Sequence, residues 1–384
     1  MAIDNKDKKI LNVPPLRFPE FTEEWKAEQL DNIATLSKGI GISKEQLSED
    51  GEPCILYGEL YTKYKSEIIK QVESKTDING SKLKRSKAND VIIPCSGETA
   101  VDIATARCVP FDNILFGGDL NVISLHQYDG AFMSYQLNGK RKYDIARVAQ
   151  GVSIVHLYGE HLKAIKTYNP TLPEQQKIAK LLSLLDDRID TQNKIIEKLQ
   201  SLIKGIAQHC IKESTSGNTY VKLGDICQIT TGKLDANAQV DNGIYPFFTC
   251  AEQPFKIDSF AFDTEALLIS GNGANLGYIN YYKGKFNAYQ RTYVLDLFSE
   301  NIQYIKWALK VLLPKRIAIE KSSSNTPYIV LSTLTDLRLP IPCKSKQSFI
   351  ANLMQSLERK LSNQIAQYDS YNYLKQYLLR QMFI

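Results

Sequence analysis

Two stretches of the chain place apolar residues at alternating spacings of four and three. The first lies within residues 174–213, and its periodic positions are Ile178, Leu182, Leu185, Ile189, Gln192, Ile196, Leu199, Ile203, Ile206 and Cys210. Adding 172 to each number gives the second set, Ile350, Met354, Leu357, Leu361, Gln364, Tyr368, Tyr371, Lys375, Leu378 and Met382. A repeat of about 3.5 residues predicts a helix whose apolar seam packs against a similar seam. One such helix could instead lie on a globular core, but two matching seams favour two long helices packed on each other.

The repeat extends upstream of both helices. At the same offset of 172, Val122 matches Val294. The run 92–97 matches the run 266–271 at an offset of 174, whereas the start of the two copies differs by 193. The sequence therefore predicts two copies of one module, with 19 additional residues in the first copy upstream of Ile92.

Each copy is predicted to be an α+β module followed by its long helix. Runs rich in β-branched and aromatic residues predict strands at 91–95, 121–125, 267–270, 277–282 and 289–297, and a helix is expected at 302–313. Turn-forming residues predict a linker between the copies. The expected boundaries are 1–170 for the first module, 171–213 for its helix, 214–219 for the linker, 220–342 for the second module and 343–384 for the second helix.

Basic residues are concentrated in one segment of the first copy. The chain has 47 Lys and Arg against 42 Asp and Glu, a net charge of +5. The segment 61–87 alone holds an excess of five positive charges, and it falls where the first copy has its additional residues. A charged run is often only a solvated surface, but an inserted basic loop is also how proteins contact DNA phosphates. We predict a DNA-binding loop containing Lys63, Tyr64, Lys65, Lys82, Lys84, Arg85 and Lys87.

Other basic and amide side chains are candidates for DNA contact in both copies. Arg pairs with guanine, and Asn or Gln pairs with adenine, through two hydrogen bonds. The candidates are Lys140, Arg141 and Lys142 in the first copy, and Lys233, Asn272, Asn275, Gln290, Arg291, Lys321 and Asn325 in the second. Each could also be an ordinary exposed residue, since phosphate contacts outnumber base contacts.

No catalytic or metal-binding pattern is recognised in the sequence. The glycines of the run 271–277 miss the dinucleotide spacing by one residue. The seven cysteines are scattered, and the four histidines lack partners at zinc-ligand spacing. No apolar stretch approaches the length of a membrane span, and residues 1–9 lack the apolar region of a secretory signal. We expect a cytoplasmic chain that binds no metal and no cofactor of its own.

Together these features resemble the specificity subunit of type I restriction–modification systems, over nearly the whole chain. The resemblance rests on the run 13–21 with Trp25, on Leu30-x-x-Ile33 recurring as Leu223-x-x-Ile226, and on Leu172-Pro-Glu-Gln-Gln-Lys-Ile178 at the start of the first helix. In the second copy the run 343–350 keeps the Gln and the Ile but loses Pro-Glu. This departure leaves the start of the second helix less well defined.

The resemblance implies two tandem target-recognition domains of similar fold, related by a pseudo-two-fold axis, with their long helices packed as an antiparallel coiled coil. Each domain would read one half of a bipartite DNA target. The chain would not be an enzyme. It would direct adenine-N6 methylation or cleavage by two modification subunits, which bind S-adenosylmethionine, and one or two restriction subunits, which use ATP and Mg²⁺. The alternative is a self-contained DNA-modifying or DNA-cleaving enzyme with an unrecognised catalytic motif.

Overall fold

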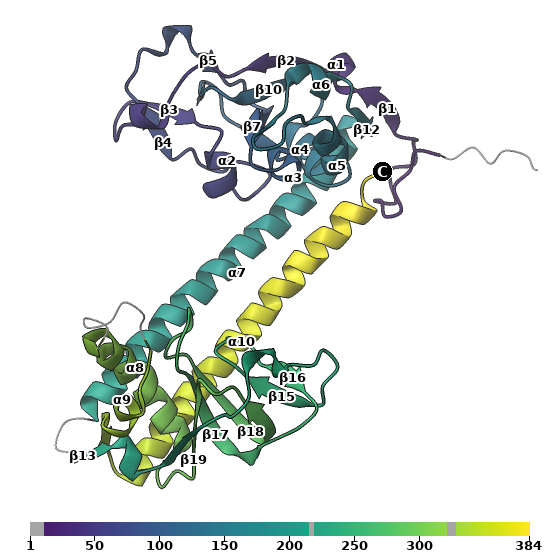
Figure 1. Cartoon of the computed structure of the whole chain (residues 1–384). Coiled ribbons are helices and arrows are strands. Elements are labelled where there is room, and N and C mark those ends of the chain that lie inside the picture. Colours follow the sequence, from purple (N-terminus) through teal and green to yellow (C-terminus); the bar gives the residue numbers. More distant parts are fainter. Residues whose placement is uncertain (1–10, 215–218, 321–327) are drawn as a thin grey trace, which may run out of the picture. The chain divides into compact units, whose positions relative to one another are not determined.

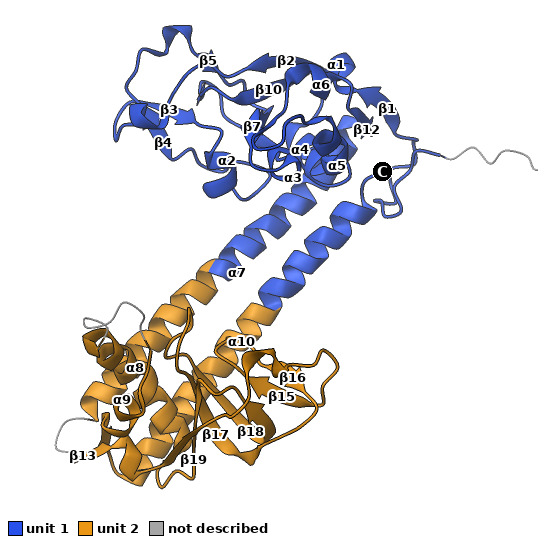
Figure 2. Ribbon diagram, in the orientation of Figure 1, with its two compact units in different colours: residues 1–193, 367–384 blue, residues 194–366 orange. Residues whose placement is uncertain are grey.

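The computed structural model describes residues 11–214, 219–320 and 328–384 of the chain. Contacts within the chain divide it into two compact units (Figures 1 and 2). Unit 1 comprises residues 1–193 and 367–384, and unit 2 comprises residues 194–366. Each unit therefore contains one globular module, the first half of the long helix that follows it, and the second half of the other long helix.

Unit 1 holds the first module, whose central sheet has the order β2-β10-β6-β8 and whose second sheet has the order β4-β3-β9-β5. Its strands are β1 (Lys26–Gln29), β2 (Ala34–Lys38), β3 (Glu52–Ile55), β4 (Ser74–Thr76), β5 (Lys84–Arg85), β6 (Asp90–Pro94), β7 (Ser96–Gly97), β8 (Arg107–Val109), β9 (Leu115–Phe116), β10 (Leu120–Leu125), β11 (Val155–His156) and β12 (Lys166–Asn169). Its helices are α1 (Leu30–Ile33), α2 (Glu59–Thr62), α3 (Ala100–Ile103), α4 (Gly130–Asn138), α5 (Lys142–Val148) and α6 (Gly159–Lys163), followed by the long helix α7 (Leu172–Glu213).

Unit 2 holds the second module, whose main sheet has the order β14-β19-β17-β18-β15-β16. Its strands are β13 (Thr219–Lys222), β14 (Gln228–Thr231), β15 (Tyr245–Phe248), β16 (Phe255–Ile257), β17 (Phe262–Ser270), β18 (Ile279–Ala288), β19 (Thr292–Asp296) and β20 (Arg338–Ile341). Its helices are α8 (Ile302–Glu320) and α9 (Leu331–Thr335), followed by the long helix α10 (Lys344–Gln381).

Two strand pairs of the first module recur in the second, residue for residue. β1 pairs with β12 through Lys26 and Asn169, and β13 pairs with β20 through Thr219 and Ile341. These pairs are related by the offsets of 193 and 172 that the sequence shows. β2 and β10 likewise pair in the register of β14 and β19. The predicted repeat is therefore a repeat of structure.

The predicted match between β6 and β17 is wrong by two residues. Leu120 pairs with Pro94 in the first module, and its counterpart Thr292 pairs with Ser270 in the second. Pro94 thus corresponds to Ser270, an offset of 176 instead of the expected 174, so the first copy has two fewer additional residues than predicted. A shift of two residues along a strand leaves every side chain on the same face, so the apolar pattern did not reveal the error.

In unit 1, the start of α7 packs against the end of α10. Ile178 and Leu182 share one apolar core with Met382 and Phe383 of the chain's last residues. Farther along α7, Asp186 contacts Lys375 of α10. Residue numbers therefore rise on one helix as they fall on the other, and the two helices are antiparallel in this unit.

In unit 2, the end of α7 packs against the start of α10. Leu199 and Ile203 of α7 lie in one core with Ile350 and Met354 of α10, and α8 packs against the same core. Toward the end of α7 the buried positions shift from the predicted heptad to Ala207 and Ile211, because this turn contacts the second module as well as α10.

The predicted seam positions are buried or partly buried in both long helices. On α7 the buried members are Ile178, Leu182, Leu185, Gln192, Ile196, Leu199 and Ile203, and Ile189 is partly buried. On α10 Ile350 and Met354 are buried, and Leu357, Leu361, Gln364, Tyr368, Tyr371 and Leu378 are partly buried. The seam residues at the start of α10 are therefore less exposed to solvent than those along the rest of that helix.

Both long helices begin with the same glutamine contacts. The Oε1 atom of Gln175 accepts a hydrogen bond from the Asp129 N–H (2.9 Å), and its Nε2 donates to the Pro170 carbonyl (2.8 Å). In the second copy, Gln347 accepts from the Asn301 N–H (3.0 Å) and donates to the carbonyl of the preceding Pro342 (2.9 Å). Each glutamine ties the start of its helix to the module before it.

The residue before each glutamine explains why the two helix openings differ in sequence. Glu174 accepts two hydrogen bonds of 2.7 Å from the Arg17 guanidinium and one of 3.2 Å from the Trp25 indole. The hydrogen bonds with Glu174 raise the pKa of Arg17. Lys346 stands in the corresponding place of the second copy and donates to the carbonyl of Glu213, the last residue of α7 (3.0 Å). The start of α7 faces the N-terminal segment, where the acidic Glu174 pairs with Arg17. The start of α10 faces the end of α7, where the basic Lys346 donates to a backbone carbonyl.

The chain enters the first module beside the end of α10. The Leu16 N–H donates to the Gln381 carbonyl at 2.9 Å. The entry to each module thus lies next to the end of a long helix, which is α10 for the first module and α7 for the second.

Candidate DNA interface

The described DNA-binding candidates of unit 2 lie at one end of its main sheet. They stand in the loops that leave or enter the strands there: Lys233 after β14, Asn272 and Asn275 between β17 and β18, and Gln290 and Arg291 before β19. Two further candidates, Lys321 and Asn325, lie outside the described residues. The structure therefore brings five separate predictions together in one place.

Backbone hydrogen bonds hold these loops against one another. The Gln290 N–H donates to the Leu234 carbonyl at 2.9 Å, and the Gly271 N–H donates to the Arg291 carbonyl at 2.8 Å. A side chain at Gly271 would collide with that same carbonyl, so glycine is needed for the close approach. The loops are positioned by main-chain contacts, which leaves their side chains available.

The side chains at this end of the sheet divide into two groups. The Asn275 amide donates to the Cys250 carbonyl at 3.0 Å, so it serves to position the neighbouring loop. Lys233, Gln290 and Arg291 are exposed, and their side chains make no hydrogen bond or ion pair with any described residue. These three are free to contact a ligand.

The basic segment of unit 1 is less free than its charge suggests. Lys63 pairs with Glu59 at 2.7 Å, and Arg85 pairs with Glu52 at 2.6 Å. Within the described part of the chain, the remaining candidates form no ion pair; they are Lys65, Lys82, Lys84 and Lys87. A side chain that is already paired must give up its carboxylate partner in order to contact a phosphate. The four unpaired lysines are therefore the better candidates for DNA contact.

Two of the predicted residues make structural contacts of their own. Tyr64 is only 7% exposed and packs in the core beneath the second sheet, and it also lines a hollow of the first module. Arg141 donates to the Ile384 carbonyl at 2.7 Å and pairs with Asp144 at 3.1 Å, so it fastens the end of the chain to the first module. Of its neighbours, Lys140 lies in the connection between α4 and α5, and Lys142 is the first residue of α5.

The first module has a hollow of about 960 Å³ at the sheet end that corresponds to the interface of the second. It opens between α2, the segment after β6 and the loop before β10, and its lining includes Tyr57, Tyr61, Lys65, Glu98, Arg107 and Asp119. Burial lowers the pKa of the Arg107 guanidinium, which bonds to the carbonyls of neighbouring segments and has no carboxylate partner in the described residues. The hollow therefore offers aromatic, basic and acidic groups together.

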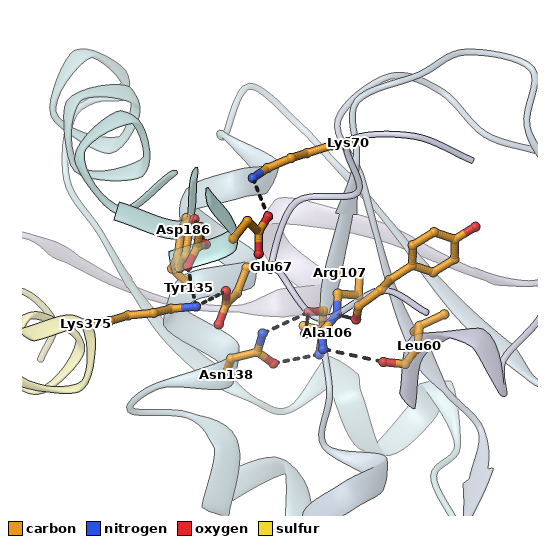
Figure 3. Close-up of polar contacts among 11 residues, drawn as sticks. Leu60, Glu67, Lys70, Ala106, Arg107, Tyr135, Asn138, Asp186 and Lys375 are labelled. Carbon is orange, nitrogen blue, oxygen red and sulfur yellow. Dashed lines mark hydrogen bonds and ion pairs between the residues drawn. The ribbon is translucent and has the colours of Figure 1, made fainter. Parts of the chain in front are cut away.

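A buried charged cluster connects the basic segment to both long helices (Figure 3). The Lys375 ammonium on α10 lies 2.6 Å from the Glu67 carboxylate and 2.7 Å from the Asp186 carboxylate on α7. The Tyr135 hydroxyl of α4 also donates to Asp186 at 2.6 Å. Nearby, Lys70 pairs with Asp187 and Asp190 on the surface of α7. The segment 61–73 is thus attached to the helices at two points.

Burial and charge act against each other in this cluster. Burial alone would lower the pKa of Lys375, but the carboxylates of Glu67 and Asp186 outweigh it and the pKa is raised. Burial raises the pKa of Asp186 although Lys375 opposes it, and it also raises the pKa of Tyr135 strongly. The Lys375 ammonium therefore keeps its charge because of the two carboxylates, and the carboxylates keep theirs because of the ammonium.

Sequence reasoning missed the acidic member of the sheet end in the first module, Asp119. The prediction concentrated on basic and amide side chains, which are the common DNA contacts. Asp119 lies 172 residues before Arg291, the offset that already matches Val122 with Val294. The signal was therefore present in the repeat.

The described residues contain no helix long and apolar enough to cross a membrane and no group of side chains suited to hold a metal ion. Two tandem α+β modules with matching sheet ends, each followed by a long helix, define a class of double-domain proteins built from a repeated unit. The family model of the type I restriction modification DNA specificity domain matches residues 22–201 and again residues 215–368. The chain therefore belongs to the type I restriction–modification DNA specificity family.

Curated relatives agree with this assignment. The type I restriction enzyme EcoDI specificity subunit of Escherichia coli is 44% identical over 137 residues, which are 36% of this chain and 30% of that protein. The MjaIX specificity subunit of Methanocaldococcus jannaschii is 25% identical over 256 residues, 56% of this chain and 59% of that protein. The MjaVIII specificity subunit of the same organism is 23% identical over 411 residues, 92% and 90% of the two chains. The matches thus span less than two thirds of the first two relatives.

Solved structures show the same fold. The S subunit of the type I restriction–modification system from M. genitalium has a TM-score of 0.69 at 19% identity, covering 97% of this chain and 99% of that one. A chain from a study of complex assembly and conformational transition of the type I R-M system has a TM-score of 0.58 at 16% identity, covering 96% and 99%. The predicted fold class is confirmed. The predicted non-catalytic role is that of the family, whose members are specificity subunits.

Proposed function

We propose that this chain is the DNA sequence-recognition subunit of a type I restriction–modification complex. Each module reads one half of a bipartite target, and the chain directs adenine-N6 methylation or cleavage by partner subunits. The observation that carries this proposal is the repeated sheet end, since two modules with the same strand register each present exposed polar side chains there. Two similar but not identical readers suit a target made of two different half-sites.

The catalytic steps belong to partners in this proposal. Two modification subunits bind S-adenosylmethionine and flip the target adenine out of the duplex for methylation. One or two restriction subunits use ATP and Mg²⁺. The recognition domains are 1–170 and 220–342, joined to the helices 171–213 and 343–384, and the complex works on DNA in the cytoplasm.

Exposed apolar side chains on the long helices support docking of the modification subunits there. Leu184 and Leu202 of α7 are 49% and 53% exposed, and Phe349 and Tyr373 of α10 are 66% and 74% exposed. Since each unit contains half of each helix, each unit offers one such surface, which fits two modification subunits. Exposed apolar side chains that form one contiguous patch mark a protein interface, so docking at this place requires those of each unit to lie together.

The test is reconstitution of the chain with its modification subunits on DNA containing random sequence. We expect methylated adenines within a split sequence that has two specified parts and an unspecified spacer. The chain without partners, given S-adenosylmethionine or Mg²⁺ and ATP, should neither methylate nor cleave DNA.

Two results would contradict the proposal. Methyl transfer or cleavage by the chain alone would support the self-contained enzyme instead. A methylated target that is continuous, with no unspecified spacer, would exclude two modules reading separate half-sites.

A further inference from the structure

Asp119 and Arg291 occupy the same structural position in the two modules. Each is the residue immediately before the central strand, β10 or β19, and these strands correspond at an offset of 172. The Asp119 carbonyl accepts a hydrogen bond from the Cys95 N–H at 2.7 Å, and the Arg291 carbonyl accepts one from the Gly271 N–H at 2.8 Å. Cys95 and Gly271 differ by 176, the offset of β6 and β17. The same main-chain contact therefore holds both residues in place.

Both side chains project from the part of the module that presents other free polar groups. Each is exposed, and neither forms a hydrogen bond or ion pair with any residue that the structure describes. Asp119 lines the hollow of the first module, and Arg291 adjoins Gln290 at the sheet end of the second. Asp119 adopts a left-handed backbone conformation, with φ of 58°, that only a few residue types accept readily. The loop is thus fixed while its carboxylate is free.

We propose that Asp119 and Arg291 are corresponding specificity-determining residues that read base edges of opposite hydrogen-bonding character. This proposal rests on the DNA-recognition function above. The Arg291 guanidinium donates two hydrogen bonds to O6 and N7 of guanine in the major groove. The Asp119 carboxylate accepts a hydrogen bond from the N4 amino group of cytosine.

The charge of Asp119 argues for a base contact. A carboxylate is repelled by phosphates, so an acidic residue at a DNA-binding surface gains nothing from the backbone. Adenine offers an amino group as well, but its N7 acceptor lies beside it and would face the carboxylate oxygens. Cytosine presents its amino donor without such a neighbour, and it is therefore the base expected opposite Asp119.

The experiment compares the methylated sequences produced by complexes of the full chain with its modification subunits. Asp119→Asn keeps the size and the backbone conformation but replaces an acceptor with an amide, which suits adenine. We expect the preference for cytosine at one position of one half-site to fall by about 5- to 150-fold, with adenine gaining and the other half-site unchanged.

Arg291→Gln tests the second module in the same way. We expect the preference for guanine at one position of the other half-site to fall over the same range, again in favour of adenine. Arg291→Lys keeps the charge but loses the planar pair of donors, so it should also relax this position. Asp31→Asn and Arg338→Gln change exposed residues elsewhere in the same modules and should leave both half-sites as they are.

The outcomes separate this inference from the proposed function. A wild-type complex that methylates no defined sequence removes the function itself. If the wild-type complex methylates a split target but both variants retain its sequence, the pairing of Asp119 and Arg291 with bases is wrong and the function stands. Retention of the guanine preference by Arg291→Gln, together with weaker DNA binding, would assign Arg291 to a phosphate. Relaxation of both half-sites by one variant would assign that residue to the fold.

Discussion

Gln175 and Gln347 form hydrogen bonds with backbone groups that lie next to the starts of the two long helices. Each glutamine is only 1% exposed. Each accepts from the N–H of the residue that caps the following module helix, Asp129 or Asn301, and donates to a carbonyl just before its own helix. One side chain thus connects three segments. A buried backbone group without a partner costs free energy, so this position tolerates few other residues.

We predict that Gln175→Ala and Gln347→Ala each lower the free energy of unfolding of their unit by ~1–3 kcal/mol, since each change leaves a partly buried N–H and a buried carbonyl unpaired. Urea denaturation followed by circular dichroism measures the effect. The adjacent exposed changes Gln176→Ala and Ser348→Ala are the matched controls and should shift stability by less than ~0.5 kcal/mol. Equal effects at Gln175 and Gln176 would contradict the role of the buried contacts.

The helix openings show what residues can and cannot reveal before a structure is known. The Gln shared by both copies was recognisable because it repeats at an offset of 172. The loss of Glu in the second copy made its helix start less well defined, because the partner that replaces Arg17 is a backbone carbonyl, at Glu213. Every residue has a backbone carbonyl, so the sequence does not indicate which carbonyl a side chain will contact. The same limit hid Asp119, whose meaning depends on the main-chain contact it shares with Arg291.

The two long helices have a carboxylate at corresponding positions, and each carboxylate pairs with a lysine from a different element. Asp186 of α7 and Glu358 of α10 correspond at the offset of 172. Asp186 pairs with Lys375 of the other long helix, whereas Glu358 pairs with Lys306 of the module helix α8 at 2.7 Å. The counterpart of Lys375 on α7 is the buried Ile203. The repeat therefore keeps the carboxylate and changes the source of the cation.

At the scale of the element we predict that Lys375→Met destabilises unit 1 by ~3–5 kcal/mol, because it leaves Glu67 and Asp186 buried without a counter-charge. Thermal and urea unfolding measure this destabilisation. Lys360→Met on the exposed face of the same helix is the control and should change stability by less than ~0.5 kcal/mol.

The charge of the cluster can be tested independently of its packing. Adding Glu67→Gln and Asp186→Asn to Lys375→Met removes the unpaired charges and should restore most of the stability. The raised pKa of Lys375 means that its ammonium contributes fully below its ordinary value of 10.5 and loses this contribution only as the pH rises through the higher folded value. In the variant Lys375 no longer opposes the effect of burial on Asp186, so the pKa of that carboxyl rises further. The destabilisation by Lys375→Met should therefore be largest at high pH and shrink as the pH falls and a carboxyl takes up a proton. A destabilisation that grows as the pH falls would contradict this account.

Patterns in the sequence predicted the two long helices, the start of α8 and five strands, those now seen as β6, β10, β17, β18 and β19, but not the short strands and helices or the exact alignment of the strands. The seam of α7 was readable because a heptad repeats over many turns. The β6 and β17 match slipped by two residues because a strand repeats every two residues and offers no longer pattern. Strands β17 and β18 also extend well beyond the runs expected, since their added residues include polar side chains on exposed stretches.

For the molecule as a whole, net charge is a poor guide to the DNA-binding surface. The excess of the segment 61–87 equals the net charge of +5, yet Lys63, Lys70 and Arg85 pair with carboxylates of the chain itself. In the proposed function, the lysines of this segment without such partners attract phosphate. Only the folded arrangement separates the two groups.

We predict that Lys82→Ala, Lys84→Ala and Lys87→Ala combined weaken DNA binding by the assembled complex at low salt and make its salt dependence shallower. The slope of log affinity against log salt should fall by about one for each phosphate that the variant no longer neutralises. Titrations at several salt concentrations measure this slope. The control Lys163→Ala removes an exposed lysine that is already paired with Glu160. An unchanged slope in the triple variant would place the phosphate contacts elsewhere.

The hydrogen bond between Leu16 and Gln381 has a topological consequence. The path of the chain runs from a module to a long helix, into the second module, along the second helix, and back to the entry of the first module. The end of α10 thus meets the entry of the first module within unit 1. Every described strand pairs within its own module, so none of these pairings requires the first module to precede the second in the sequence.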